Sequence, residues 1–342
     1  MHASMKSALT GLILAVASTH VAAAQESSPA SSAGAYQQPR TSNGLPDLQG
    51  HWTNTSLTSL ERPRDLSSLM LTEEQAQRAA QVRNTATARD SEPTDPNSPA
   101  PPAGNVGGYN QFWIDAGSSF AKVNGEYRSS WIVEPADGKV PYNEAGQKLF
   151  SASMTSQRNE TSDPEVRSLG ERCLLGFGSS GGPPMLNVSY NNHYQIVQTP
   201  EAIVLYSEMI HDARIVRINA QHLPSTMRRW MGDSIGRWEG TTLVVETINM
   251  HPQESMRVFY GQSLYVSDEA TITERFTRVS DTQLLYRFEI DDPSVYARPW
   301  KAEMSFNAAD QNSFEYACHE GNYSMPGILA GGRLDERLVR KK

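Results

Sequence analysis

The chain has 342 residues, of which 38% are hydrophobic and 20% are charged, and its formal net charge is −8. Nucleic acid binding requires a concentrated positive surface, whereas the basic residues here are scattered singly or in pairs, so we expect no nucleic acid partner. A negative charge of this size keeps a protein soluble and does not indicate an oligomeric state.

The N-terminus has the pattern of a cleaved signal peptide. Lys6 precedes an apolar run at residues 8–17, and small residues at 22–24 precede Gln25. A membrane-spanning helix needs ~20 apolar residues, and no later apolar stretch is longer than this run, so we predict no membrane span. The mature protein is therefore expected to be periplasmic or secreted.

The composition then changes along the chain in a way that predicts five consecutive parts. Ser, Ala, Gln and Pro dominate after the signal, which is typical of a flexible segment. The parts are a signal peptide at 1–24, a flexible leader at 25–43, an irregular N-terminal part at 44–190 that packs on a barrel, an antiparallel β-barrel at 191–333 and a tail at 334–342.

Few regular elements are expected in the irregular part. Thr72 and Gln75 form a capping box, which predicts a helix at residues 72–80. We also predict a strand at 130–133, a helix at 143–151 and a long proline-rich loop at 90–108.

Short alternating or β-branched runs, bounded by turn residues, fill the rest of the chain and predict an antiparallel meander. A meander without helical crossovers must hide its edge strands, and closure into a barrel does so. We therefore favour a lipocalin-like barrel over a sandwich, and a barrel of about eight to ten strands encloses space for one small ligand. The nine predicted strands are at residues 194–199, 202–208, 213–218, 234–239, 242–249, 270–279, 283–291, 300–307 and 314–319.

Apolar and polar residues alternate most clearly in the predicted strand at 283–291. This pattern predicts one buried and one exposed face, with Tyr286 on the buried face. Trp238 and Trp300 also lie on predicted strands and are expected to fill the barrel. If the barrel keeps an open cavity, Tyr286 and Trp238 are expected to contact its ligand.

The sequence has two cysteines, Cys173 and Cys318. An even number in an exported chain favours a disulfide, and the alternative is two buried free thiols. Such a bridge would close a long loop, for which the chain-entropy model gives a stabilisation somewhat above ~4.7 kcal/mol. It would also hold the glycine-rich turn at 176–182 beside the last predicted strand, with Ser179, Ser180 and His319 on one rim.

Four segments of the sequence are distinctive: Gly44–Trp52, Ile132–Gly138, Gly232–Gly240 and Tyr316–Tyr323. The third reads Gly-Asp-Ser-Ile-Gly-Arg-Trp-Glu-Gly, and the fourth reads Tyr-Ala-Cys-His-Glu-Gly-Asn-Tyr. Together they make the chain resemble a family of exported bacterial proteins of unknown function. The resemblance covers nearly all of the mature chain and implies one folded unit from Gly44 to Arg333, without an assigned catalytic residue.

Acidic, basic and imidazole side chains are concentrated at residues 208–214. A regular strand would place Glu208, Asp212 and Arg214 on one side and His211 on the other, unless a bulge intervenes. The pattern fits a site that orients and polarises a carbonyl group, and it equally fits a salt-bridged turn between strands. The site interpretation requires His211 inside the barrel.

His319 follows Cys318 at the end of the last predicted strand, where a disulfide would hold the backbone still. A histidine titrates near pH ~6.5 and can act as a general acid or base, and the alternative is that His319 caps a strand end. Antiparallel pairing could bring His193 near His211. We predict His211, His319, Glu208 and Asp212 as catalytic residues and His193, Arg214, Tyr286, Trp238 and Glu320 as binding residues.

No organic cofactor and no metal are predicted. A divalent ion such as zinc would have to bind His193, His211 and His319 with Glu208 or Glu320. No short ligand spacing such as His-Glu-x-x-His supports such a site.

Two functions remain open from these residues. The first is an acid–base enzyme, a lyase, hydratase, isomerase or hydrolase, that acts on a small, partly apolar molecule in the barrel. The second is a non-catalytic periplasmic carrier for a hydrophobic small molecule.

Overall fold

The computed structural model describes residues 36–92, 97, 99, 114–259 and 262–340 of the chain. The predicted signal peptide lies outside the described residues, as do most of the predicted leader and most of the proline-rich loop. In the part of the chain that the structure describes, no helix is long and apolar enough to span a membrane.

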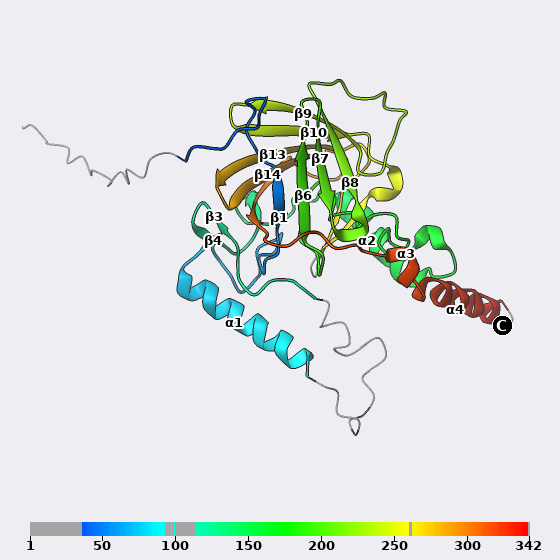
Figure 1. The fold of residues 1–342 in the computed structure, drawn as a ribbon. Coiled ribbons are helices and arrows are strands. Elements are labelled where there is room, and N and C mark those ends of the chain that lie inside the picture. The colour runs from blue at the N-terminus through cyan, green and yellow to red at the C-terminus, as the bar shows by residue number, and fades with distance from the viewer. Residues whose placement is uncertain (1–35, 93–96, 98, 100–113, 260–261, 341–342) are drawn as a thin grey trace, which may run out of the picture. The chain divides into compact units, whose positions relative to one another are not determined.

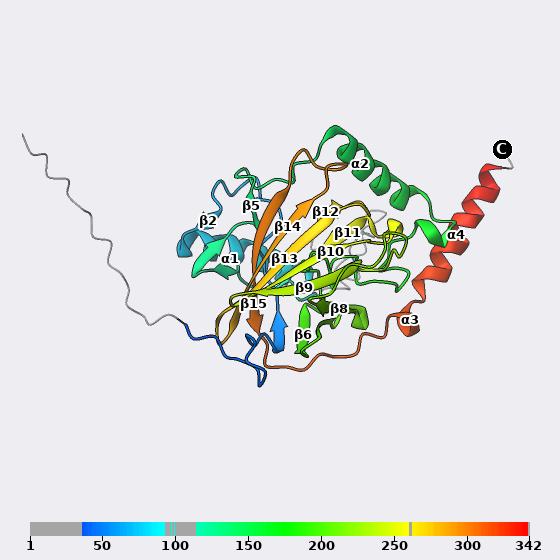
Figure 2. The same ribbon diagram turned by 90° about the horizontal axis from the view of Figure 1, so that it is seen from above.

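The centre of the fold is a closed barrel of nine strands, as the alternating runs of the sequence predict (Figures 1 and 2). The first and last strands pair with each other, and Trp52 lies opposite Ala308. Eight of the nine predicted strands are confirmed. In order around the barrel the strands are β1 (Gly50–Thr53), β6 (His193–Gln198), β7 (Ala202–Ser207), β8 (Ala213–Ile218), β9 (Asp233–Glu239), β10 (Thr242–Ile248), β13 (Thr271–Ser280), β14 (Gln283–Asp291) and β15 (Trp300–Ala308).

The sheet differs from the expected antiparallel meander between β8 and β9. These two strands run parallel, with Val216 opposite Ser234, whereas the other neighbouring pairs of the barrel are antiparallel. A parallel pair requires a long connection, and residues 219–232 provide it, because they carry the chain back to the starting end. The barrel is therefore mixed, and a likeness to the antiparallel lipocalin barrels is not confirmed.

Aromatic side chains fill the barrel interior. Tyr286 and Phe288, on the predicted buried face of β14, are at most 2% exposed. The ring centroid of Tyr286 lies 5.4 Å from that of Phe306, and the centroid of Phe288 lies 5.6 Å from that of Trp300. Trp300 is fully buried, as expected, and Trp238 is half-buried against the same core. The space in which we expected a ligand is thus occupied by side chains of the barrel itself.

The region before the barrel is more ordered than its composition predicts. The capping box of Thr72 and Gln75 is present, and the helix that it begins continues to Asp90. Residues 50–53 form a barrel strand, which contradicts their assignment to an irregular part packed on the barrel. The other elements of this region are β2 (Met70–Leu71), α1 (Glu73–Asp90), β3 (Lys122–Val123), β4 (Glu126–Arg128), β5 (Ile132–Glu134), α2 (Glu144–Asn159) and the 3-10 turn η2 (Pro164–Val166).

The described end of the predicted leader is also folded. The Tyr36 hydroxyl donates to Asp281 Oδ1 at 3.1 Å, and Arg40 pairs with Pro46 in an isolated bridge. Tyr36 therefore contacts the β13–β14 turn, and the pairing of Arg40 with Pro46 orders the segment that follows.

The chain after the barrel differs most from its prediction. Residues 314–319 do not form a strand, because the free edge of β15 is already taken by β1 and β5. Two helices follow instead, α3 (Cys318–Gly321) and α4 (Ser324–Val339), so the segment expected as a tail is largely helical. Between barrel strands lie the 3-10 turns η3 (Met209–His211) and η4 (Pro252–Glu254) and the hairpin strands β11 (Met256–Phe259) and β12 (Gln262–Tyr265).

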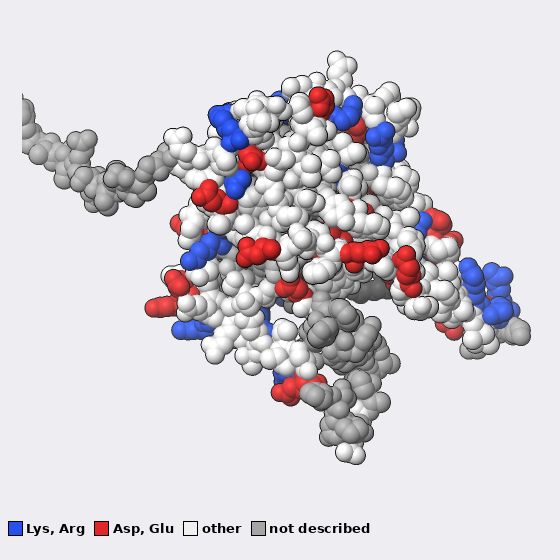
Figure 3. All heavy atoms as spheres, viewed as in Figure 1, with Lys and Arg blue, Asp and Glu red and all other residues white. Residues whose placement is uncertain are grey.

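Acidic and basic side chains are interspersed on the face drawn in Figure 3. Basic side chains gather on this face at the far end of α4. Elsewhere on the same face each sign occurs in small groups, as in the sequence.

Candidate functional site

Residues 208–214, which the sequence singles out, connect β7 to β8 through η3. Glu208, Asp212 and Arg214 are all buried, at 8% exposure or less, and His211 is exposed. Ile210 and His211 have positive φ values of 56° and 50°, and residues 209–211 form the turn η3 instead of a regular strand. The alternation that we expected across residues 208–212 is therefore absent, and the condition that places His211 inside the barrel is not met.

Glu208 holds the chain that leaves the barrel. Its Oε1 accepts from Asn191 Nδ2 at 2.7 Å, and its Oε2 accepts from the backbone N–H of Phe314 at 2.8 Å. His193 Nδ1 lies 4.0 Å from Oε1, and Gln311 contacts the other ring nitrogen of His193 at 2.7 Å. Both oxygens of Glu208 are satisfied, so this cluster ties the segment after β15 to the β6–β7 hairpin.

Arg214 and Tyr286, both predicted as binding residues, meet inside the barrel at Glu274. Arg214 donates to both carboxylate oxygens of Glu274, and the Tyr286 hydroxyl donates to Oε1 at 2.7 Å. The same hydroxyl accepts from the backbone N–H of Met185 at 2.9 Å. Burial raises the pKa of Tyr286 well above its usual value. We call these three side chains the barrel network.

Asp212 belongs to a second buried group, which we call the carboxyl cluster: Asp212, Glu254 and Arg257. Asp212 Oδ2 accepts from the backbone N–H of Gly176 at 2.8 Å, and Glu254 Oε2 accepts from that of Met231 at 2.8 Å. Glu254 Oε1 lies 3.5 Å from Arg257 Nη2. Glu254 and Arg257 are at most 1% exposed, since η4 and β11 turn them inward.

The two carboxyl groups of this cluster have pKa values near neutral pH. Burial raises the pKa of Asp212 from 3.8 to about 7, and the Gly176 hydrogen bond opposes this. Burial also raises the pKa of Glu254 from 4.5 to about 7, with Arg257 opposing and the nearby Asp212 charge adding to the rise. The Asp212 charge therefore disfavours ionisation of Glu254, although burial is the larger cause of the raised pKa of Glu254.

Several polar atoms around the cluster have no hydrogen-bonding partner among the described residues. These atoms are Glu254 Oε1, Arg257 Nη1 and Ser180 Oγ. Ser180 is fully buried and borders the cluster, because a Cβ added to Gly176 would lie 2.9 Å from Ser180 Oγ. Buried polar groups are nearly always paired, so these atoms keep the capacity to bind water, an ion or another molecule.

A glycine-rich segment, residues 176–182, covers the carboxyl cluster. A Cβ on Gly181 would lie 2.9 Å from Met231 Sδ and 3.0 Å from Asp212 Cβ, so any larger residue would require these side chains to shift. Gly178 has a φ of +70°, and its Cβ would lie 2.7 Å from the Met256 carbonyl oxygen. The glycines therefore bring the backbone of this segment close to Asp212.

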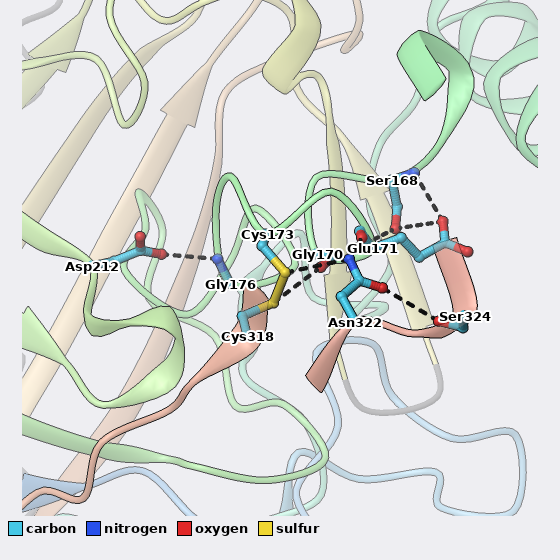
Figure 4. Close-up of a disulfide and its surroundings, with 9 residues drawn as sticks. All are labelled: Ser168, Gly170, Glu171, Cys173, Gly176, Asp212, Cys318, Asn322 and Ser324. Carbon is cyan, nitrogen blue, oxygen red and sulfur yellow. Dashed lines mark hydrogen bonds between the residues drawn. A yellow bond between two sulfur atoms is a disulfide. The ribbon is translucent and has the colours of Figure 1, made fainter. Parts of the chain in front are cut away.

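The predicted disulfide is present. Cys173 and Cys318 are bonded, with Cα atoms 5.7 Å apart, and the bridge joins α3 to the turn that leads into Gly176 (Figure 4). The bridge is compatible with a protein exported to an oxidising compartment. Asn322 Nδ2 also donates to the Glu171 carbonyl oxygen at 2.7 Å, which gives a second link between α3 and this turn.

His319 and Glu320 lie on α3 and are exposed. Ser179 and Ser180 are fully buried, so the bridge does not place them on one rim with His319. The reason is that the last predicted strand is absent: the backbone carries His319 outward from the Cys318 bridge in a short helix.

Among the described residues, no group of three or more His, Cys, Asp or Glu residues could hold a metal ion. Of the possible zinc ligands named from the sequence, His193 and Glu208 lie close together, with Nδ1 and Oε1 4.0 Å apart, but they do not form part of a larger group.

Sequence reasoning missed Glu254, Arg257 and Glu274. Glu274 had a signal, since it is a charged residue on the apolar face of an alternating strand, between Ile272 and Phe276. Glu254 and Arg257 had none, because no element was predicted at residues 252–259.

Comparisons with protein-family models, curated proteins and solved structures find no match to this chain. The resemblance to a family of exported bacterial proteins therefore stays a prediction.

Proposed function

We propose that the protein is an exported acid–base enzyme that acts on a small, partly apolar molecule without an organic cofactor, and that Asp212 and Glu254 transfer the proton. The observation that carries this proposal is the burial of two carboxyl groups under one glycine-rich segment, where Glu254 Oε1 and Ser180 Oγ have no hydrogen-bonding partner among the described residues. Asp212 is one of the catalytic residues predicted from the sequence. Glu254 takes the catalytic role that was predicted for His211 and His319, which are exposed.

The chemistry follows from the raised pKa values of the two carboxyl groups. With both values at about 7, each group near neutral pH can accept a proton when ionised and donate one when protonated. Arg257 Nη1 and the Ser180 hydroxyl would donate to an oxygen of the substrate as negative charge develops there. A lyase, hydratase, isomerase or hydrolase needs these two roles.

The site is closed in this conformation. Asp212 is 8% exposed, and Met231 and the segment at 176–182 lie over it. Substrate reaches the carboxyl cluster when this cover moves, as in enzymes that exclude water by closing a loop.

Carriage of a hydrophobic molecule has less support. A carrier needs an open apolar cavity, and aromatic side chains fill the interior of this barrel. Export itself is supported by the predicted signal peptide and by the bonded cysteines.

Depletion of metabolites tests the proposal. The purified protein would be incubated with a small-molecule extract of its host, and mass spectrometry would follow which compounds disappear and which appear. We expect conversion by the wild type and by Glu144→Gln, whose carboxylate is exposed, and loss of conversion in Asp212→Asn and Glu254→Gln. A compound that binds and is recovered unchanged, or equal conversion by all four proteins, would contradict the proposal.

A further inference from the structure

A groove of about 250 Å³ lies outside the wall that covers the carboxyl cluster. The wall is formed by β11 and residues 176–180, because Val258 N–H donates to the Phe177 carbonyl oxygen at 2.8 Å. Alternation along β11 gives the wall two different faces. Met256 and Val258 line the groove, whereas Arg257 is fully buried on the other side.

The floor of the groove is apolar. Phe177, Met256, Val258 and Tyr265 line it, and all four are partly exposed. Partly exposed apolar side chains around a concave surface gain contacts when an apolar molecule covers them.

On the polar side of the groove, two side chains donate hydrogen bonds to one carboxylate. Arg172 Nη2 donates to Glu165 Oε2 at 3.0 Å, and Gln253 Nε2 donates to the same oxygen at 3.3 Å. The Arg172 side chain is 14% exposed, whereas that of Glu165 is 58% exposed. The guanidinium is therefore part of the groove wall, and the carboxylate reaches it from solvent.

Glu165 is a weak partner for these donors. An ion pair with an exposed carboxylate is screened by water and gains little. A carboxylate attached to an apolar body would offer the same two hydrogen bonds and would in addition cover the floor. Arg167, which also lines the groove, donates to Glu171 Oε1 at 2.7 Å, so its charge is already paired and Arg172 is the arginine whose partner is exposed.

We propose that the groove binds a small amphipathic carboxylate, with its carboxylate in place of Glu165 on Arg172 and Gln253 and its apolar body on Phe177, Met256 and Val258. The volume limits the ligand to a molecule of the size of an aromatic acid or a medium-chain fatty acid. This site requires no proton transfer by Asp212 or Glu254, so it goes beyond the proposed enzyme activity.

Titration calorimetry with matched probes tests the site. Benzoate and octanoate are the charged probes, and benzamide and octanol have the same apolar bodies without the charge. We expect the wild type to bind each carboxylate about tenfold more tightly than its uncharged counterpart, as one charge-assisted hydrogen bond implies.

Two substitutions should change the affinity in opposite directions. Arg172→Met should weaken binding of benzoate and octanoate about tenfold and leave octanol binding unchanged. Glu165→Gln removes the competing carboxylate and should tighten binding of both acids. Arg275→Met, which removes an arginine paired with an exposed Glu239 on another surface, is the matched control and should bind as the wild type does.

Gln253→Ala tests the same site if Arg172→Met fails to fold. Gln253 is exposed, so its loss should not disturb the fold. It should weaken acid binding a few-fold while the melting temperature stays that of the wild type. Absence of carboxylate binding by the wild type, unchanged affinity in Arg172→Met, or weaker binding in Glu165→Gln would overturn the proposal.

Discussion

The barrel network and the carboxyl cluster are both buried, and they differ in how their polar atoms are paired. Both oxygens of Glu274 accept hydrogen bonds inside the barrel, and the Tyr286 hydroxyl both donates and accepts. Arg214 Nε lacks a hydrogen-bonding partner among the described residues, as do Glu254 Oε1 and Arg257 Nη1 of the carboxyl cluster, but of the two carboxylates only that of Glu254 has an oxygen without a hydrogen bond. A carboxylate that accepts hydrogen bonds at both oxygens stabilises one structure, whereas an oxygen without a hydrogen bond keeps its capacity to bind another molecule. The comparison separates a structural network from a candidate site at similar burial.

The largest expected effect is in the barrel network. Glu274→Gln leaves the buried Arg214 guanidinium without a counter-charge, and breaking a buried ion pair in this way costs roughly 3–5 kcal/mol. Urea unfolding would measure the loss. Lys301→Gln, which breaks an exposed pair with Glu134, should cost less than ~1 kcal/mol, and equal losses in the two variants would show that the barrel network is not structural.

Removal of the disulfide should act on the other region. Replacing Cys173 and Cys318 with serine is expected to lower the free energy of unfolding by roughly 2–5 kcal/mol, because the unfolded chain loses a long-range constraint. It should also release the turn that carries Gly176. Hydrogen exchange should therefore speed up at the Gly176 amide and stay slow in β13 and β14. A melting temperature unaffected by reductant would contradict this expectation.

The carboxyl cluster should make the free energy of unfolding depend on pH. The unfolded chain releases the protons of Asp212 and Glu254 at their usual pKa values of 3.8 and 4.5, whereas the folded protein holds them up to about pH 7. The folded state binds more protons in this range, so its stability falls as pH rises, by ~1.4 kcal/mol per pH unit for each group.

Asp212→Asn removes one of these titrations. Its unfolding free energy relative to the wild type should rise by a few kcal/mol between about pH 4 and about pH 7, measured by urea unfolding. Glu144→Gln should follow the wild type, since its carboxylate is exposed. Parallel curves for Asp212→Asn and the wild type would show that Asp212 titrates normally.

The smallest effect compares two adjacent serines. Ser179 and Ser180 are both fully buried; Ser179 donates a hydrogen bond to the Val258 carbonyl oxygen, whereas Ser180 Oγ has no partner among the residues that the structure describes. Ser179→Ala should cost ~1 kcal/mol, whereas Ser180→Ala should be neutral or slightly stabilising because it removes an unpaired hydroxyl. If Ser180 serves the site, its alanine variant should lose turnover without losing stability. A stability loss as large as that of Ser179→Ala would refute the unpaired state of Ser180.

Local patterns made much of the barrel predictable. Alternation in β14 identifies its buried face, and the hairpin turns give the neighbours of most strands. β1 could not be found in this way, because it is four residues long and its partners β6 and β15 are distant in the sequence. Helix α4 was not predicted, because Pro326 and the glycines of this segment lower its helix propensity. A proline in the first turn of a helix is nevertheless tolerated.

Half of the candidate site could be predicted and half could not. Asp212 stood out as an acid next to a predicted strand, and the bonding of Cys173 to Cys318 follows from their number. Glu254 joins Asp212 through the turn η4, and Arg257 through the short strand β11, neither of which has a periodic pattern. The prediction that His211 lies inside the barrel was wrong, because a left-handed backbone conformation at a non-glycine residue cannot be predicted from the neighbouring residues.

The pairing of β1 with both β6 and β15 has a consequence for biogenesis. Synthesis runs from the N-terminus, so β1 is made early and its partner β15 is made almost last. Until Trp300–Ala308 has emerged, the barrel cannot close, and β1 and β15 cannot protect each other's edges. Such distant pairings make folding slow and leave hydrophobic surface exposed meanwhile. Closure of this barrel is thus a post-translational event. Until then the chain needs protection from aggregation, for example by chaperones.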